Sequence, residues 1–208
     1  MALPNSQYLK WFKEIESELW SFFRLFEDIC GQCYNYTINQ AEGHAGRDIS
    51  NWCCCLTDNQ LHDNWDCLNP LQKTIDSKWY EKLKGKGVEL GRCRMPNNGP
   101  CPALGRQGCL LGHFRTISCT TQICGKMMEM MKRLKVIDNY KRAPLQIEDI
   151  IPLPVILPIL YGIKPGKVDE SQVKEYLRSL RDLKKKMKAI DQKERKKIVD
   201  EVMADYLN

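Results

Sequence analysis

The sequence lacks the segments that carry proteins out of the cytoplasm or into a membrane. Its first twenty residues, MALPNSQYLKWFKEIESELW, contain no basic segment followed by an apolar one, so we expect no secretory signal there. The longest apolar stretch, residues 150–162, is shorter than the roughly 20 residues of a membrane helix and contains three prolines. These absences predict a cytoplasmic protein without a membrane span.

Motifs for common catalytic sites are missing as well. No Ser/His/Asp arrangement or catalytic carboxylate pair stands out, and the chain has only three histidines. Cysteine is distributed unevenly: all eleven lie between positions 30 and 124, and positions 125–208 have none. This asymmetry predicts two parts, a cysteine-rich metal-binding domain at residues 1–125 and a basic helical extension at residues 126–208 that packs on it or on a partner.

So many thiols in one region form either disulfides or a metal site, and the cellular compartment decides between the two. The number of cysteines is odd, and the neighbours within the triplet 53–55 cannot pair with one another without strain. Metal ligation in a reducing cytoplasm is therefore the better explanation. It also suits a turn-rich chain, because structural zinc contributes about 10–16 kcal/mol to the folding of small peptides.

Charge follows the same division. Residues 1–124 contain 13 basic and 13 acidic side chains, whereas residues 125–208 contain 19 basic and 13 acidic ones and carry the whole formal charge of +6. The basic part is expected to face the anionic thiolate site or an acidic protein partner. Nucleic acid is a disfavoured partner, because acidic residues lie among the basic ones on either side of the lysine run 184–188 and aromatic residues are scarce there.

Hydrophobic periodicity predicts a mainly α fold, with helices and irregular loops organised around a cysteine-ligated metal centre and a C-terminal helical extension. Apolar residues recur at helical spacing from position 8 to position 26, and this helix leads into Cys30-Gly-Gln-Cys33. The polar residues 34–52 predict a loop. Residues 119–137 predict a methionine-rich helix, and residues 143–166 predict an extended stretch.

The last forty residues predict two helices. The first has an apolar seam from Val173 to Ile190, at the alternating spacing of a short coiled coil or helical hairpin. Asp191 followed by Glu194 is typical of a capping box and predicts that a new helix begins there.

The candidate metal ligands fall into three groups along the chain. Cys30 and Cys33 have the CxxC spacing at which two thiolates reach one metal. A triplet and a downstream series complete the set, which comprises Cys30, Cys33, Cys53, Cys54, Cys55, Cys101, Cys109, Cys119 and Cys124. Arg115 lies between two of these and is either an ordinary surface arginine or a hydrogen-bond donor to a thiolate, an inorganic sulfide or an anionic substrate.

The segment CPALGRQGCLLGHFRTISCTTQIC resembles the C-terminal half of the CxxCxxCC family, whose members are described as zinc- or iron-chelating proteins. The positions that match this half of the family pattern are Cys101, Cys109, Arg115, Cys119 and Cys124. Upstream, Cys30 and Cys33 match the opening CxxC, and two of the three cysteines at 53–55 match its CC pair. The resemblance covers residues 30–124 and implies that these cysteines chelate a metal and that Arg115 hydrogen-bonds the site.

The sequence also departs from that family. Nineteen residues separate the CxxC pair from the triplet where the family has a few, and Thr116 stands at the usual proline. Cys67 and Cys93 are additional. These differences leave open which thiols bind and whether there are one or two sites.

Sulfur ligands suit both an iron–sulfur cluster and zinc. The surplus of thiols and the scarcity of histidine favour a cluster of the [4Fe–4S] type, with zinc as the alternative. We therefore expect a metalloprotein with a redox, metal-handling or structural role. Two alternatives remain: a lysine N-methylase-like enzyme, because some members resembling this family are flagellin lysine N-methylases, and a zinc-stabilised nucleic-acid or protein adaptor.

Overall fold

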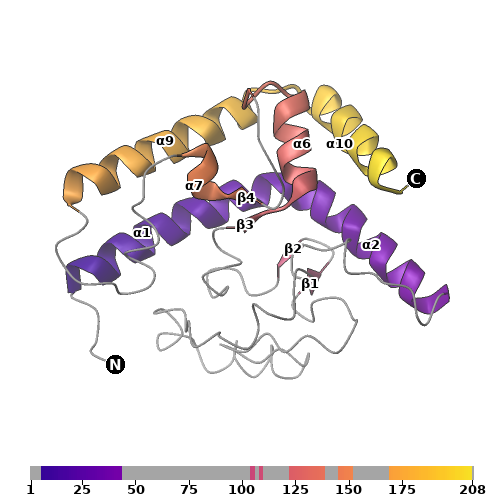
Figure 1. Cartoon of the computed structure of the whole chain (residues 1–208), viewed down its shortest axis with the longest axis horizontal. Coiled ribbons are helices and arrows are strands. Elements are labelled where there is room, and N and C mark those ends of the chain that lie inside the picture. The colour runs from indigo at the N-terminus through magenta and orange to yellow at the C-terminus, as the bar shows by residue number, and fades with distance from the viewer. Residues whose placement is uncertain are drawn as a thin grey trace.

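The computed structural model describes residues 6–43, 104–105, 108–109, 122–138, 145–151 and 169–207. Within these ranges the fold is mainly helical, as the sequence predicts, and the strands are four segments of two residues each (Figure 1). The triplet at residues 53–55 lies outside the described residues, and so does the segment 71–84, LQKTIDSKWYEKLK, whose sequence predicts a short amphipathic helix.

The N-terminal part is one nearly continuous helical rod. It consists of α1 (Ser6–Phe23), the 3₁₀ turn η1 (Arg24–Phe26) and α2 (Glu27–Gly43), which follow one another directly (Figure 1). Phe12, Leu19 and Phe22 are at most 2% exposed, so the predicted apolar face of this helix is confirmed. Each such side chain contributes roughly 1.5–3 kcal/mol through its removal from water.

The prediction of a loop at residues 34–52 is wrong for its first ten positions, because α2 continues to Gly43. Residues 34–43, YNYTINQAEG, have weak intrinsic helix propensity. The residues before them are already helical, however, and adding a residue to an existing helix costs far less than starting one. The helix therefore extends past the point at which composition alone suggests that it stops.

Two short antiparallel ladders occupy the middle of the chain. In the first, Leu104 of β1 (Leu104–Gly105) lies opposite Cys109 of β2 (Gly108–Cys109). In the second, β3 (Gln122–Ile123) pairs with β4 (Leu145–Gln146). The first ladder closes a hairpin, and the second closes a longer stretch of the chain.

Between β3 and β4 lies α6 (Gly125–Arg133), and α7 (Ile147–Ile150) follows β4. The predicted helix at 119–137 is thus confirmed over α6 and wrong at β3, where the chain is extended. Its methionine contacts are confirmed, because the side chains at 127, 128, 130 and 131 are buried. The expected extended stretch at 143–166 is confirmed at β4. It is wrong at α7, whose first residue, Ile147, is buried in the core. Residues 143–144 and 152–166 lie outside the described residues.

α6 ends in a hydrogen-bonded turn of the Schellman type. The backbone N–H of Val136 donates to the carbonyl of Met131, and that of Lys135 donates to the carbonyl of Lys132, each at 2.9 Å. Lys135 has a φ of 54°, in the left-handed region where glycine is the usual residue. A lysine at this position therefore carries a backbone cost that glycine would not.

The two predicted C-terminal helices are confirmed as α9 (Glu170–Lys188) and α10 (Gln192–Leu207). Asp169 forms a complete capping box with Gln172 at the start of α9. At the predicted second cap, the carboxylate of Asp191 accepts hydrogen bonds from the backbone N–H groups of Lys193 at 2.9 Å and Glu194 at 3.2 Å. The side chain therefore satisfies donors that the first turn of α10 leaves open.

The predicted seam on α9 is buried, but its partner is not the next helix. α9 packs along α1 and η1, whereas α10 packs on α2 and α6 (Figure 1). The buried residues of all these helices form one hydrophobic cluster. Helices from both predicted parts of the chain thus share a core, and the boundary at residue 125 stays a prediction.

Ion pairs flank the packed faces of α1 and α9. Glu18 accepts hydrogen bonds from Arg181 at 2.7 Å and from Lys184, and Arg181 also reaches Glu14 at 3.3 Å. Burial raises the pKa of the Glu18 carboxyl, but the hydrogen bonds and charges of Lys184 and Arg181 outweigh it and hold the pKa below its ordinary value of 4.5. This ion pairing therefore stabilises the folded state with Glu18 ionised.

We expect Glu18→Gln to lower the free energy of unfolding at pH 7 by about 1 kcal/mol. A carboxyl whose pKa is lowered by folding stabilises the fold at pH values above its pKa in the unfolded chain. This stabilisation is lost as the pH falls through its pKa in the folded protein. The difference in stability between Glu18→Gln and the unchanged protein should therefore shrink below pH 4.5. Urea unfolding at pH 7 and pH 3.5 measures it. Glu175→Gln, on an exposed pair with Arg178, is the control with little effect; an equal Glu18 effect at both pH values contradicts the prediction.

Lys135→Gly should stabilise the protein by about 0.5–1 kcal/mol. The substitution removes the energetic cost of a left-handed backbone conformation at the end of α6, and the greater conformational entropy of glycine in the unfolded chain cancels part of that gain. Thermal unfolding measures the change. The matched control is Lys132→Gly within α6, which should lose about 1 kcal/mol. A loss at both positions would show that the Lys135 side chain outweighs its backbone cost.

Candidate metal centre

Cys30 and Cys33 lie one turn apart on α2, so the packed helix carries this pair as the sequence predicts. Residues three apart on a helix share a face, with Cβ atoms about 5–6 Å from one another. Cys33 is buried and Cys30 is half-buried, and both are thiols rather than disulfides. Two sulfur donors are therefore presented together from one rigid element.

The last helix covers this pair. The Cys33 thiol donates to the thioether of Met203 in α10, with an Sγ–Sδ distance of 4.0 Å. The neighbouring Gln32 donates from Nε2 to Oδ1 of Asp200, one turn earlier in α10, at 3.0 Å. The residues of the CGQC motif thus dock on α10, which shields Cys33 from water.

Met203 is a neighbour of the candidate site that sequence reasoning did not find. The helical periodicity places it on the apolar face of α10, and it is 2% exposed. Nothing in that periodicity indicates that its contact is a cysteine 170 residues away. A methionine sulfur is itself a soft donor of the kind that thiophilic metals accept.

A second cysteine-bearing segment lies against the same helix. The hairpin of β1 and β2 packs on α2 (Figure 1). Its second strand ends at Cys109, whose backbone pairs with Leu104. Cys101 precedes this hairpin by three residues in the sequence. The backbone therefore brings a segment of the downstream cysteine series to the helix that carries Cys30 and Cys33.

Cys124 is the third thiol whose side chain the structure describes. It stands at the N-cap of α6, half-buried and packed against the hydrophobic cluster that includes Cys33. Its backbone carbonyl accepts a hydrogen bond from Met128 at 3.1 Å. The position of Cys124 thus depends on how α6 is held.

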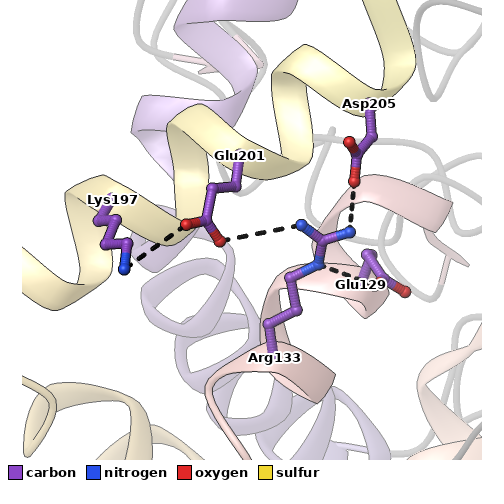
Figure 2. A network of polar contacts seen from close by, with 5 residues as sticks. All are labelled: Glu129, Arg133, Lys197, Glu201 and Asp205. Atoms are coloured by element: carbon purple, nitrogen blue, oxygen red, sulfur yellow. Dashed lines mark hydrogen bonds and ion pairs between the residues drawn. The ribbon is translucent and has the colours of Figure 1, made fainter.

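An ion-pair network fixes α6 to α10 (Figure 2). Arg133 donates from Nε to Glu129 at 2.9 Å and from Nη2 to Asp205 at 2.5 Å, and its Nη1 lies 4.0 Å from Glu201. Lys197 reaches the other oxygen of Glu201 at 3.7 Å. The hydrogen bonds to Glu129 and Asp205 raise the pKa of the guanidinium, so Arg133 is charged at every relevant pH. The network keeps α6 against the helix that also covers Cys33.

The other candidates remain predictions. Cys53, Cys54, Cys55, Cys101, Arg115 and Cys119 lie outside the described residues, and for Cys109 the backbone alone is described. Among the side chains that the structure does describe, no three of His, Cys, Asp or Glu lie close enough together to hold a metal ion. In the predicted thiolate site Cys30 and Cys33 would fill two positions, and the other ligands would come from the remaining cysteine-bearing segments.

Comparison with known proteins adds no identification. No protein-family model matches the sequence, no curated protein matches it, and no solved structure matches the fold. None of the helices that the structure describes combines the length and apolar character that crossing a membrane requires.

We expect Met203→Ala to lower stability by about 2–5 kcal/mol and to expose Cys33. Under native conditions the iodoacetamide alkylation of Cys33, located by mass spectrometry, should accelerate at least ten-fold. Met128→Ala removes an equally buried methionine from α6 and is the matched control. Equal acceleration in both variants would mean that global opening, rather than the α10 contact, governs access to Cys33.

Proposed function

We propose that this chain is a cytoplasmic, cysteine-ligated metalloprotein that binds an iron–sulfur cluster, with [4Fe–4S] preferred and zinc as the alternative. The observation that carries the proposal is the packing of the β1–β2 hairpin, which ends at Cys109, against the helix that bears Cys30 and Cys33. Cysteines that are far apart in the sequence are thus borne by neighbouring elements. The role that we propose for the bound metal is redox chemistry, metal handling or structural stabilisation.

In this proposal Cys30 and Cys33 supply two ligands from α2, and Cys109 and other cysteines of the downstream series supply the rest. A bound cluster would contribute one-electron redox chemistry, and zinc would contribute only structural cross-linking. The residues of the chain do the positioning: Gln32 fixes α2 against α10 through Asp200, and Met203 keeps water from one side of the CxxC pair. An apolar, weakly hydrated environment of this kind limits solvent access to a thiolate-bound metal and so alters its reduction potential.

The two alternatives rest on the sequence alone. The lysine N-methylase-like enzyme lacks a recognisable S-adenosylmethionine loop in the sequence, and the adaptor rests on the charge of the C-terminal helices. An acidic protein partner for those helices likewise stays a prediction.

Anaerobic purification followed by metal and acid-labile sulfide analysis tests the proposal. We expect a brown protein with iron and sulfide in equal amounts, or a colourless protein with stoichiometric zinc. Cys33→Ser and Cys109→Ser should each lose at least half of the bound metal, because each removes a ligand of one site. Cys67→Ser and Cys93→Ser are the controls, since neither belongs to the candidate set, and they should keep it.

Two results would overturn the proposal. One is a protein purified anaerobically with neither metal nor sulfide, even after reconstitution with iron and sulfide or with zinc. The other is metal that survives Cys33→Ser and Cys109→Ser but is lost in the two control variants. Circular dichroism of each variant separates loss of a ligand from loss of the fold.

A further inference from the structure

The basic charge of this protein is concentrated in one short segment. Residues 184–197, which we call the lysine corner, contain eight basic and two acidic side chains. Their net charge of +6 equals the formal charge of the whole chain. The lysine corner comprises the end of α9, the turn at residues 189–191 and the start of α10 (Figure 1).

Most of this charge is exposed and has no acidic partner among the residues that the structure describes. The exposed lysines without such an ion pair are Lys185, Lys186, Lys188, Lys193 and Lys196. Elsewhere on the same helices the cations are matched: Arg181 pairs with Glu14 and Glu18, and Lys174 pairs with Glu170. Along α9 and α10 the uncompensated charge is therefore confined to the lysine corner.

Helix stability explains the lysines at the end of α9 but not those at the start of α10. Lys185, Lys186 and Lys188 lie in the last turn of α9, where the helix dipole favours positive charge. The dipole of α10 disfavours Lys193 and Lys196 near its start, where the carboxylates of Asp191 and Glu194 compensate part of the charge. A charge placed against the local rule, and repelled by its neighbours, is characteristic of a functional surface.

The shape of the lysine corner decides which anionic partner fits. Its outermost lysines lie about 6–9 Å along the two helix axes from the turn, within roughly one Debye length at physiological salt. A flat anionic surface that meets the turn attracts all of them at once, without any fixed geometry for each side chain. Seven of the eight basic residues are lysines, which act as hydrated point charges rather than as bidentate clamps.

Other partners fit less well. A protein interface needs a central apolar or aromatic anchor, and within the lysine corner Met187 is buried and Ile190 is half-buried in the core. Single-stranded nucleic acid needs aromatic platforms, and residues 184–197 contain no aromatic residue. We propose that the lysine corner docks the protein reversibly on an anionic membrane surface, through lipid headgroups of the phosphatidylserine class.

Co-sedimentation of the full chain with vesicles tests this proposal. The vesicles contain either one part phosphatidylserine to two parts phosphatidylcholine or phosphatidylcholine alone, and each kind is tested at low and at high NaCl concentration. We expect binding to the anionic vesicles at low salt only. Each surface lysine near the membrane contributes about five-fold in affinity, so the variant with Lys185, Lys188, Lys193 and Lys196 changed to glutamine should bind about 100-fold more weakly or worse.

The matched control changes Lys10, Lys13, Lys135 and Lys174 to glutamine, four exposed lysines outside the lysine corner, and should lose less than ten-fold. An equal loss in both variants would overturn the proposal, because net charge and not the lysine corner would then drive binding. Tighter binding to poly-L-glutamate or to a short DNA duplex, with the same dependence on the corner lysines, would overturn it in favour of an acidic protein or nucleic acid. Circular dichroism checks that both variants are folded.

Discussion

The burial of α1 against α9 is the interaction on which the rest of the structure depends. Phe12, Leu19 and Phe22 on one side and Leu180 on the other are each at most 2% exposed. These two helices come from opposite ends of the sequence, so their packing closes the chain on itself. Because η1 joins α1 directly to α2, fixing α1 also fixes the direction of the helix that carries Cys30 and Cys33.

Polar contacts then select one arrangement among those that apolar packing allows. Apolar faces of helices tolerate rotation and sliding, whereas Glu18 meets both Arg181 and Lys184 only in one register of α1 on α9. Arg133 does the same for α6 on α10 through Asp205 and Glu201. Such partly exposed ion pairs add modest stability. Their main effect is to keep the faces that bear Cys33 and Cys124 in fixed positions.

Local patterns predicted the helices well. The apolar spacing of α1, the seam of α9 and the cap at Asp191 are properties of a few consecutive residues, so periodicity and capping chemistry are enough to find them. The end of α2 was missed because Tyr34 to Gly43 has the composition of a loop, although extending an existing helix costs far less than starting one.

Local patterns of this kind do not predict which helices pack against one another. The seam of α9 has the spacing of a coiled coil, and nothing in it distinguishes α1 from α10 as the second strand. In the same way, CxxC spacing predicts a pair of thiols on one element, but not that Met203 covers one of them. Long-range contacts depend on complementarity between two surfaces, which one sequence does not reveal. The cysteines whose convergence would define the metal site remain sequence predictions for that reason.

The helical setting of Cys30 and Cys33 has a consequence for how a metal site would assemble. In many CxxC sites a flexible turn closes around the ion, so metal binding supplies the order. Here apolar packing and the contacts to Asp200 and Met203 already hold α2 in place. In the proposed metalloprotein the first two sulfurs are therefore positioned by the folded core, and the energy of ligation is left to order the segments that bring the others. The core then determines where the site forms, and the metal determines how the cysteine-rich part folds around it.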